Sequence, residues 1–135
     1  MKTLIILIKV FSSLIFIVLL FPACQKTELG KEIYFRVGEK QKITSNLSLT
    51  VDSIWDSRCP TGWECLWSGD VALFFNISHS HKQIDTLLTC YPGPNAIPFD
   101  IAGYKWKVLE VNPYPDNSYS TEPKDILIKM IITDD

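Results

Sequence analysis

The sequence predicts an all-β protein, an antiparallel β-sandwich or partly open barrel of about seven strands that follows an apolar N-terminal segment. Three observations support this fold class. Apolar and polar residues alternate with a period of two through most of the chain, turn-forming residues separate the alternating runs, and no segment beyond residue 31 carries a helical stripe. The length of 135 residues fits one such domain, which we place at residues 32–135.

The alternation locates the strands. Side chains two residues apart share one face of a strand, so each apolar set is expected to face the core. Turn signals rich in glycine, proline, asparagine and serine separate the runs. The clearest runs are residues 47–51, 71–77, 84–88, 104–108 and 126–132, and the turn signals are at 37–39, 45–46, 92–95 and 112–117.

Two histidines occur close together, in His79-Ser80-His81. The polar run predicts a hairpin turn with solvated imidazoles. Metal binding is the alternative, but it needs further ligands that the sequence does not offer nearby. We therefore expect no metal and no cofactor.

The first 23 residues have the layout of a lipoprotein signal peptide. Lys2 supplies a basic start and residues 4–21 are almost wholly apolar. The segment ends in Phe21-Pro22-Ala23-Cys24, which resembles a lipobox, where a small residue precedes a cysteine that receives lipid before cleavage. Plain secretion and an uncleaved anchor are the alternatives. The stretch after Lys9 is short for a span of about 20 residues.

Lipidation at Cys24, with palmitate among the acyl chains, would anchor the protein in the membrane through a tether at residues 24–31. We expect a bacterial cell-envelope location. Gln25 favours the outer membrane, because it replaces the aspartate that marks inner-membrane retention in some bacteria. Cleavage leaves 11 basic and 15 acidic side chains, a net charge of −4, so the composition offers no electrostatic basis for nucleic-acid binding.

Two cysteines lie in a compact run of turn-forming residues. Cys59 and Cys65 have five residues between them, including Pro60 and Gly62, and export implies an oxidising compartment. We expect a disulfide that stabilises the fold by roughly 2–3 kcal/mol. Zinc is the alternative, although a single cysteine pair is a weak signal. Cys90 is left without a partner, and burial as a small hydrophobic residue is favoured over an exposed thiol.

Three tryptophans and a charged pair accompany these cysteines. Trp55 is an even number of residues from the apolar side chains at 47–51, and Trp67 is an even number from those at 71–75. Each is therefore expected to share their strand face and to lie in the core. Trp63 lies inside the loop and is the candidate contact residue; alternatively, it folds back over the open end of the sandwich. Asp56 and Arg58 are further candidate contacts, since both make charge-assisted hydrogen bonds, but the favoured interpretation is that Arg58 ties the loop to a carboxylate or to strand-end carbonyls.

The run Asp-Ser-Arg-Cys-Pro-x-Gly-x-x-Cys-x-Trp-x-Gly at residues 56–69 resembles the signature of a family of small lipoproteins from Bacteroidota-type bacteria. Residues 103–104 and 109–115 are also similar to that family's penultimate strand and turn, and the resemblance covers roughly residues 32–132. This chain departs from the pattern with Trp63 in place of a smaller aliphatic residue and Ser68 in place of alanine. The resemblance implies a β domain and an envelope location, and no particular activity.

The sequence contains no nucleophile elbow, no zinc-protease helix motif, no phosphate loop and no C-x-x-C. It therefore favours a non-catalytic binding or structural module over an enzyme. A protease inhibitor that presents the Cys59–Cys65 loop is a second hypothesis. A hydrolase with an unrecognised site, such as a Cys90–histidine dyad, is a third.

Overall fold

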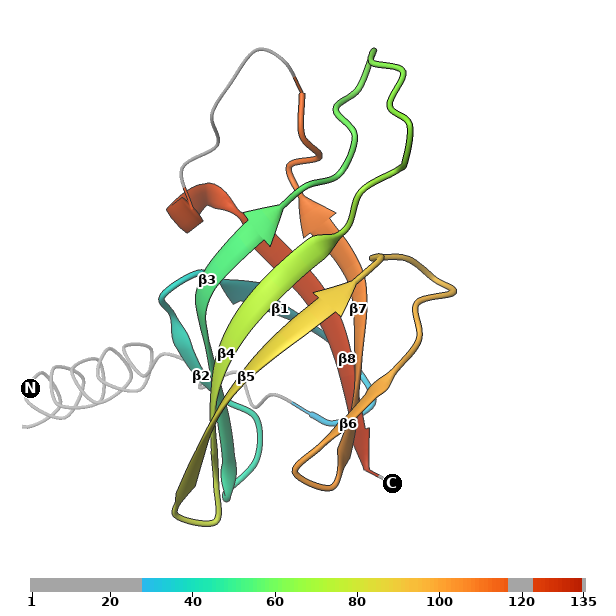
Figure 1. Cartoon of the computed structure of the whole chain (residues 1–135). Helices are drawn as coiled ribbons and strands as arrows, with labels where there is room; N and C mark the ends of the chain where they lie inside the picture. Colours follow the sequence, from blue (N-terminus) through green and yellow to red (C-terminus); the bar gives the residue numbers. More distant parts are fainter. Residues whose placement is uncertain (1–27, 117–122, 135) are drawn as a thin grey trace, which may run out of the picture.

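The computed structural model describes residues 28–116 and 123–134, and within them the chain is all-β. Two antiparallel four-stranded sheets pack together as a sandwich that does not close into a barrel (Figure 1). The predicted fold class is confirmed. The signal peptide, Cys24 and the first residues of the tether lie outside the described residues.

Each sheet has its own strand order. One sheet runs β1-β8-β7-β6 and consists of Glu32–Arg36 (β1), Phe99–Ile101 (β6), Tyr104–Asn112 (β7) and Leu127–Asp134 (β8). The other runs β2-β3-β4-β5 and consists of Lys40–Lys42 (β2), Leu47–Asp56 (β3), Val71–His79 (β4) and Lys82–Cys90 (β5). A 3₁₀ turn at Pro123–Asp125 precedes β8.

The five alternating runs of the sequence correspond to β3, β4, β5, β7 and β8. The other three strands are short, and β2 and β6 have three residues each, which is too few to show a period. The predicted hairpin turn is formed by Ser80 and His81, whose positive φ angles of 48° and 68° match the twist of the flanking strands.

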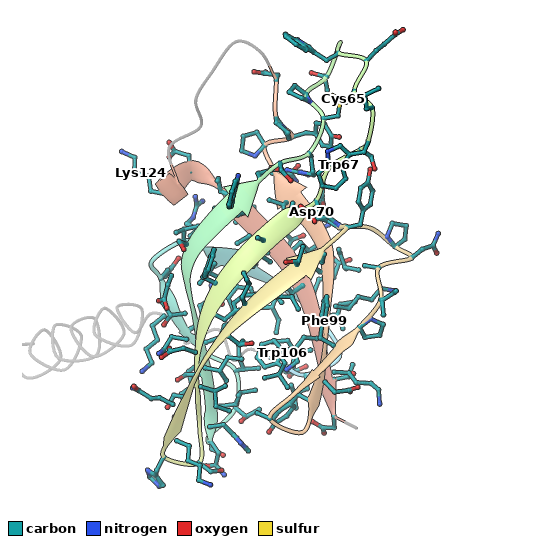
Figure 2. The ribbon with its side chains drawn as sticks, in the orientation of Figure 1. Cys65, Trp67, Asp70, Phe99, Trp106 and Lys124 are labelled. Atoms are coloured by element: carbon teal, nitrogen blue, oxygen red, sulfur yellow. A yellow bond between two sulfur atoms is a disulfide. The ribbon has the colours of Figure 1, made fainter. Side chains whose placement is uncertain are left out.

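The core lies between the sheets. The alternating apolar side chains of both sheets interdigitate there, which is the usual source of stability in a sandwich. Figure 2 shows Trp106 and Phe99 in this layer. The most deeply buried members are Phe35, Leu47, Leu49, Val51, Val71, Leu73, Ile77, Trp106, Val108, Ile128, Met130 and Ile132.

Two β-bulges shift the alternation. In β3 the register changes between Val51 and Ser53, and in β7 it changes between Val108 and Glu110. An extra residue at a bulge moves every later side chain to the opposite face of the sheet. In β3, the bulge changes the face on which the residues from Ser53 to Asp56 lie.

The sandwich has two ends, which we call the loop pole and the tether pole. At the loop pole Asp56 is paired with Val71, and Asn112 with Leu127. At the tether pole the His79 ring lies against the Tyr104 ring, with centroids 5.7 Å apart. The described chain begins near the tether pole, because Gly30 donates a backbone hydrogen bond to Ile132, close to the end of β8.

Candidate functional site: the disulfide loop

The candidate site is the connection from β3 to β4, residues 57–70, which we call the disulfide loop. It extends past the ends of both strands at the loop pole (Figure 1). Figure 2 shows Cys65 far out on the loop, with Trp67 and then Asp70 progressively closer to the sheet. The loop therefore has a base at the ends of the two strands and an outer part that extends beyond them (Figure 2).

A buried arginine holds the base. Arg58 is 7% exposed, and its Nε donates to Asp56 Oδ1 at 2.8 Å while Nη2 pairs with Oδ2 of the same carboxylate. The guanidinium also lies 4.5 Å from the centre of the Tyr114 ring, and Nη2 donates to the Pro113 carbonyl at 3.4 Å. Because Tyr114 and Pro113 follow β7, Arg58 connects the loop to the opposite sheet.

This geometry bears on two sequence candidates. The interpretation that Arg58 ties the loop to a carboxylate and a strand-end carbonyl is confirmed. The Arg58 guanidinium and the Asp56 carboxylate are thus engaged with each other inside the base. We assign both residues to holding the loop; a direct ligand contact for either one stays a prediction.

A second set of contacts fastens the two ends of the loop to each other. Ser57 donates its backbone N–H to the Asp70 carbonyl at 2.9 Å and its hydroxyl to Asp70 Oδ1 at 2.8 Å. One step outward, Cys59 N–H donates to the Ser68 carbonyl at 2.9 Å. Thr61 N–H reaches the Pro115 carbonyl at 3.1 Å. The base is thus closed by backbone hydrogen bonds and braced against the segment after β7.

Gly69 allows this close approach. Its φ is +74°, and a Cβ placed there would lie 1.9 Å from the Ser57 carbonyl oxygen and 2.7 Å from Arg58 Cα. Both neighbours are backbone atoms, so a side chain could be accommodated only by moving one edge of the base. Glycine is required here by space as well as by conformation.

The outer part of the loop is closed covalently. Cys59 and Cys65 form the predicted disulfide, so the zinc alternative is wrong for these two cysteines. Among residues 28–116 and 123–134, no group of three or more potential metal ligands comes together. The bond holds the loop tip independently of packing, which is needed because little of the tip contacts the sheets.

Three large apolar side chains face solvent from this closed tip. Trp63 is 61% exposed, Trp67 is 63% exposed, and Leu66 is fully exposed. The alternative in which Trp63 folds back over the open end of the sandwich is therefore wrong. The core position predicted for Trp67 is also wrong: β4 begins only at Val71, so Trp67 belongs to no strand face and the parity argument does not apply to it.

The core position predicted for Trp55 is wrong as well, because of the β3 bulge. Before the bulge Val51 faces inward; after it, Ile54 packs against the core and Trp55 faces outward with 71% of its surface exposed. Trp55 is paired with Ala72 on the outer face of the sheet. It lies at the foot of the disulfide loop, one residue before β3 ends.

Two exposed residues that were not predicted from the sequence extend the same outer face. Phe74 and Leu87 are cross-strand partners on β4 and β5, and both are exposed. The sequence held a signal for them, since each is a large apolar residue at a position where the alternation of its strand predicts an outward-facing, polar side chain. Neither Pro113 nor Tyr114, the distant partners of Arg58, had any comparable signal.

An apolar groove adjoins the base of the loop. It has a volume of about 560 Å³ and is lined by residues 89–97 and Phe99 of the β5–β6 connection. Tyr91 and Ile97 are exposed on it, while Cys90 is the buried member of the lining. Cys90 is paired with Val71, the first residue after the disulfide loop. The groove therefore begins at the loop pole and follows the β5–β6 connection as far as Phe99.

Cys90 is buried and unpaired, as predicted. Burial, with a smaller contribution from the Asp70 carboxylate, raises the pKa of the Cys90 thiol to about 11, so the thiol stays protonated at neutral pH. The proposed Cys90–histidine dyad is not formed. His79 is at the far end of β4 from Val71, the residue opposite Cys90, and His81 lies in the turn beyond it.

Comparison of the chain with protein-family models, curated proteins and solved structures finds no match. In the part of the chain that the structure describes, no helix is both long and apolar enough to cross a membrane. Functional inference therefore depends on the geometry of the loop pole itself.

Proposed function

We propose that this protein is a cell-envelope lipoprotein, anchored through Cys24, that acts as a non-catalytic binding module. Its contact surface is the tip of the disulfide loop with Trp63 at the centre. The partner is a protein or a glycan. The anchor is inferred from the lipobox-like sequence at residues 21–24, and the contact surface from the loop geometry.

The observation that carries the binding role is the exposure of Trp63, Leu66 and Trp67 on a loop whose shape is fixed in advance. Tryptophan is enriched at binding hot spots because it buries a large surface on association. A preorganised loop loses little conformational entropy when it binds. The disulfide and the buried Arg58 supply that preorganisation here.

The anchor and the loop are compatible in space. The described chain begins near the tether pole, and four Cα–Cα steps from Cys24 to Glu28 span at most about 14 Å. The nine residues of β4 separate the two poles by about 26 Å. A lipid at Cys24 would therefore leave room for the loop to face away from its own membrane, toward a partner in the adjoining compartment.

The test compares loop variants with a matched control in the full lipoprotein. Envelope proteins and glycans retained by immobilised wild-type protein are identified, and their affinities are then measured for Trp63→Ala, Trp67→Ala and Tyr34→Ala. Tyr34 is an exposed aromatic on β1, in the other sheet. We expect each loop variant to bind at least about 10-fold more weakly and the control to be unchanged, as for hot-spot residues.

If the two loop variants bind the partner as tightly as the Tyr34→Ala control does, the loop is refuted as the contact surface. Unfolding free energies are measured in parallel, because a truncated buried tryptophan loses about 3–5 kcal/mol and would imply a structural role instead. The anchor is tested separately by mass spectrometry of membrane-associated protein. An unmodified Cys24 there would contradict it.

A protease inhibitor is a second candidate, favoured by one observation: residues 59–65 extend beyond the ends of the strands on a disulfide-closed loop, a shape that can enter a cleft (Figure 1). We expect such an inhibitor to resist cleavage only while the loop is closed. Incubation with serine and cysteine proteases would distinguish the two functions. Loss of protease activity at stoichiometric protein, abolished in Cys59→Ser/Cys65→Ser, would support inhibition; full protease activity would exclude it for the enzymes tested.

A further inference from the structure

A polar groove with a positively charged lining lies at the opposite end of the molecule from the disulfide loop. It has a volume of about 520 Å³ and spans the outer edge of β2, the start of β3 and the β4–β5 turn. Its lining contains two lysines, a histidine and several hydroxyl groups, but no carboxylate. The groups suited to binding an anion are the ammonium groups of Lys40 and Lys42 and the hydroxyls of Ser48, Ser78 and Ser80.

The positive charge of this groove is local. The chain as a whole is acidic, with 13 basic and 15 acidic side chains. Lys40 and Lys42 are two residues apart on β2 and are paired with Thr50 and Ser48 of β3, neither of which carries charge. Within the described ranges, the ion-paired cations are elsewhere, at Lys31, Arg58, Lys105 and Lys129. The two groove lysines are thus available to an external anion.

The groove also lies at the tether pole. Ser80 N–H donates to the Asn46 carbonyl at 3.0 Å, which joins the β4–β5 turn to the β2–β3 turn at the end of the groove. His79, next to Ser80, contacts Tyr104, and Tyr104 is paired with Asp134 at the end of β8. The described chain begins near this end. If Cys24 carries lipid, the start of the described chain at Glu28 is held within about 14 Å of the membrane surface.

We propose that this lysine groove binds the anionic phosphate headgroups of the membrane that holds the lipid anchor. The proposal rests on the proposed anchoring at Cys24. A phosphate is attracted by both ammonium groups and can accept hydrogen bonds from the Ser48, Ser78 and Ser80 hydroxyls. The attraction acts over roughly a Debye length of 8–10 Å, which a short tether brings within reach. Each lysine at an anionic surface strengthens association about fivefold.

The consequence is an orientation. A lipid anchor alone fixes one point and leaves the domain free to tilt, whereas a second contact through the groove sets the tether pole against the membrane. The disulfide loop then stands at the membrane-distal end, where a partner can reach it (Figure 1). The groove would thus present the loop rather than bind the partner.

The test measures the accessibility of lysines in the lipidated full-length protein reconstituted into vesicles. One vesicle is pure phosphatidylcholine and the other contains about a quarter phosphatidylglycerol, so that only the second has a negative surface potential. An amine-reactive label, read by mass spectrometry, reports on Lys40, Lys42 and Lys82, with Lys124 near the loop pole as the internal reference. We expect the three lysines to be labelled several-fold more slowly on anionic vesicles, reversibly with added salt, and Lys124 to be unchanged.

Two charge-matched variants separate the groove from general electrostatics. In Lys40→Gln/Lys42→Gln the protection of Lys82 on anionic vesicles should disappear. In Arg36→Gln/Lys107→Gln, which loses the same charge elsewhere and keeps Lys124 as the reference, it should persist. Equal labelling of Lys40 and Lys42 on both vesicles, or equal behaviour of the two variants, would overturn the proposal.

The remaining outcomes are also decisive. Protection of Lys40 and Lys42 by a soluble acidic polysaccharide on neutral vesicles, without any effect of anionic lipid, would assign the groove to a glycan and refute the headgroup site. A protein that associates with neither vesicle would refute the anchor, and with it the membrane role of the groove. A protein that associates equally with both, without lipid-dependent protection, would refute the groove alone.

Discussion

Replacing Gly69 with alanine should open the base of the disulfide loop. The substitution places a methyl group 1.9 Å from the Ser57 carbonyl oxygen, where ordinary contact needs more than 3.4 Å. The two edges of the base must therefore separate by more than 1 Å, which exceeds the range of about 0.5 Å over which the N···O distances of hydrogen bonds vary. That separation would break the bonds from Ser57 N–H to Asp70 and from Cys59 N–H to Ser68, each 2.9 Å long.

The expected loss of stability follows from these parts. The positive φ of +74° costs a non-glycine residue about 1–2 kcal/mol. Each of the two backbone hydrogen bonds contributes a further 0.5–1.5 kcal/mol or so, about 1–3 kcal/mol together. We expect Gly69→Ala to lose about 2–5 kcal/mol, measured by urea unfolding of the purified protein with the disulfide intact.

Gly62 is the matched control. It lies in the same loop with a φ of +82°, but an added Cβ there would meet nothing within 4 Å. Gly62→Ala should therefore lose only the conformational part, about 1–2 kcal/mol. If the two variants lose equal amounts, the close approach at Gly69 does not limit the stability of the fold and the reasoning is refuted.

Three further predictions concern buried groups. Arg58→Met should lose about 3–5 kcal/mol in denaturant unfolding because it leaves the Asp56 carboxylate without its buried partner, and Asp56→Asn/Arg58→Met should recover part of that loss. Trp106→Ala, at 1% exposure, should lose about 3–5 kcal/mol, whereas Trp55→Ala should lose under about 1 kcal/mol; equal losses would contradict the assigned β3 bulge. The Cys90 thiol, whose pKa burial raises to about 11, should react at pH 8 at least about 100-fold more slowly with iodoacetamide in the native than in the unfolded state. Because the unfolded thiol ionises at a lower pH than the folded one, stability should also fall as pH rises from about 9 to 11, and Cys90→Ala should reduce that slope.

The sequence alone determined the fold class, because strand alternation is a local property. Side chains at i and i+2 share a face whatever the rest of the molecule does, so the order of residues is enough to locate the five long strands and the turns between them. The disulfide was equally local, since Cys59 and Cys65 are too close in the chain for their pairing to depend on distant packing. The exposed tip at Trp63 was one of two alternatives that the sequence left open.

Which face of the sheet each tryptophan occupies depends on tertiary packing, which the sequence pattern does not contain. A single extra residue after Val51 reverses the parity of β3, and no propensity in the sequence marks a bulge at that point, so Trp55 was assigned to the wrong side. The core position predicted for Trp67 was wrong for a related reason. Residues two apart share a face only within a strand, and β4 starts four residues after Trp67. The contacts of Arg58 with Pro113 and Tyr114, and the placing of the lysine groove and the disulfide loop at opposite poles, depend on pairings between residues far apart in the chain. Local sequence patterns do not predict such pairings, because the pairings are fixed by how the two sheets stack.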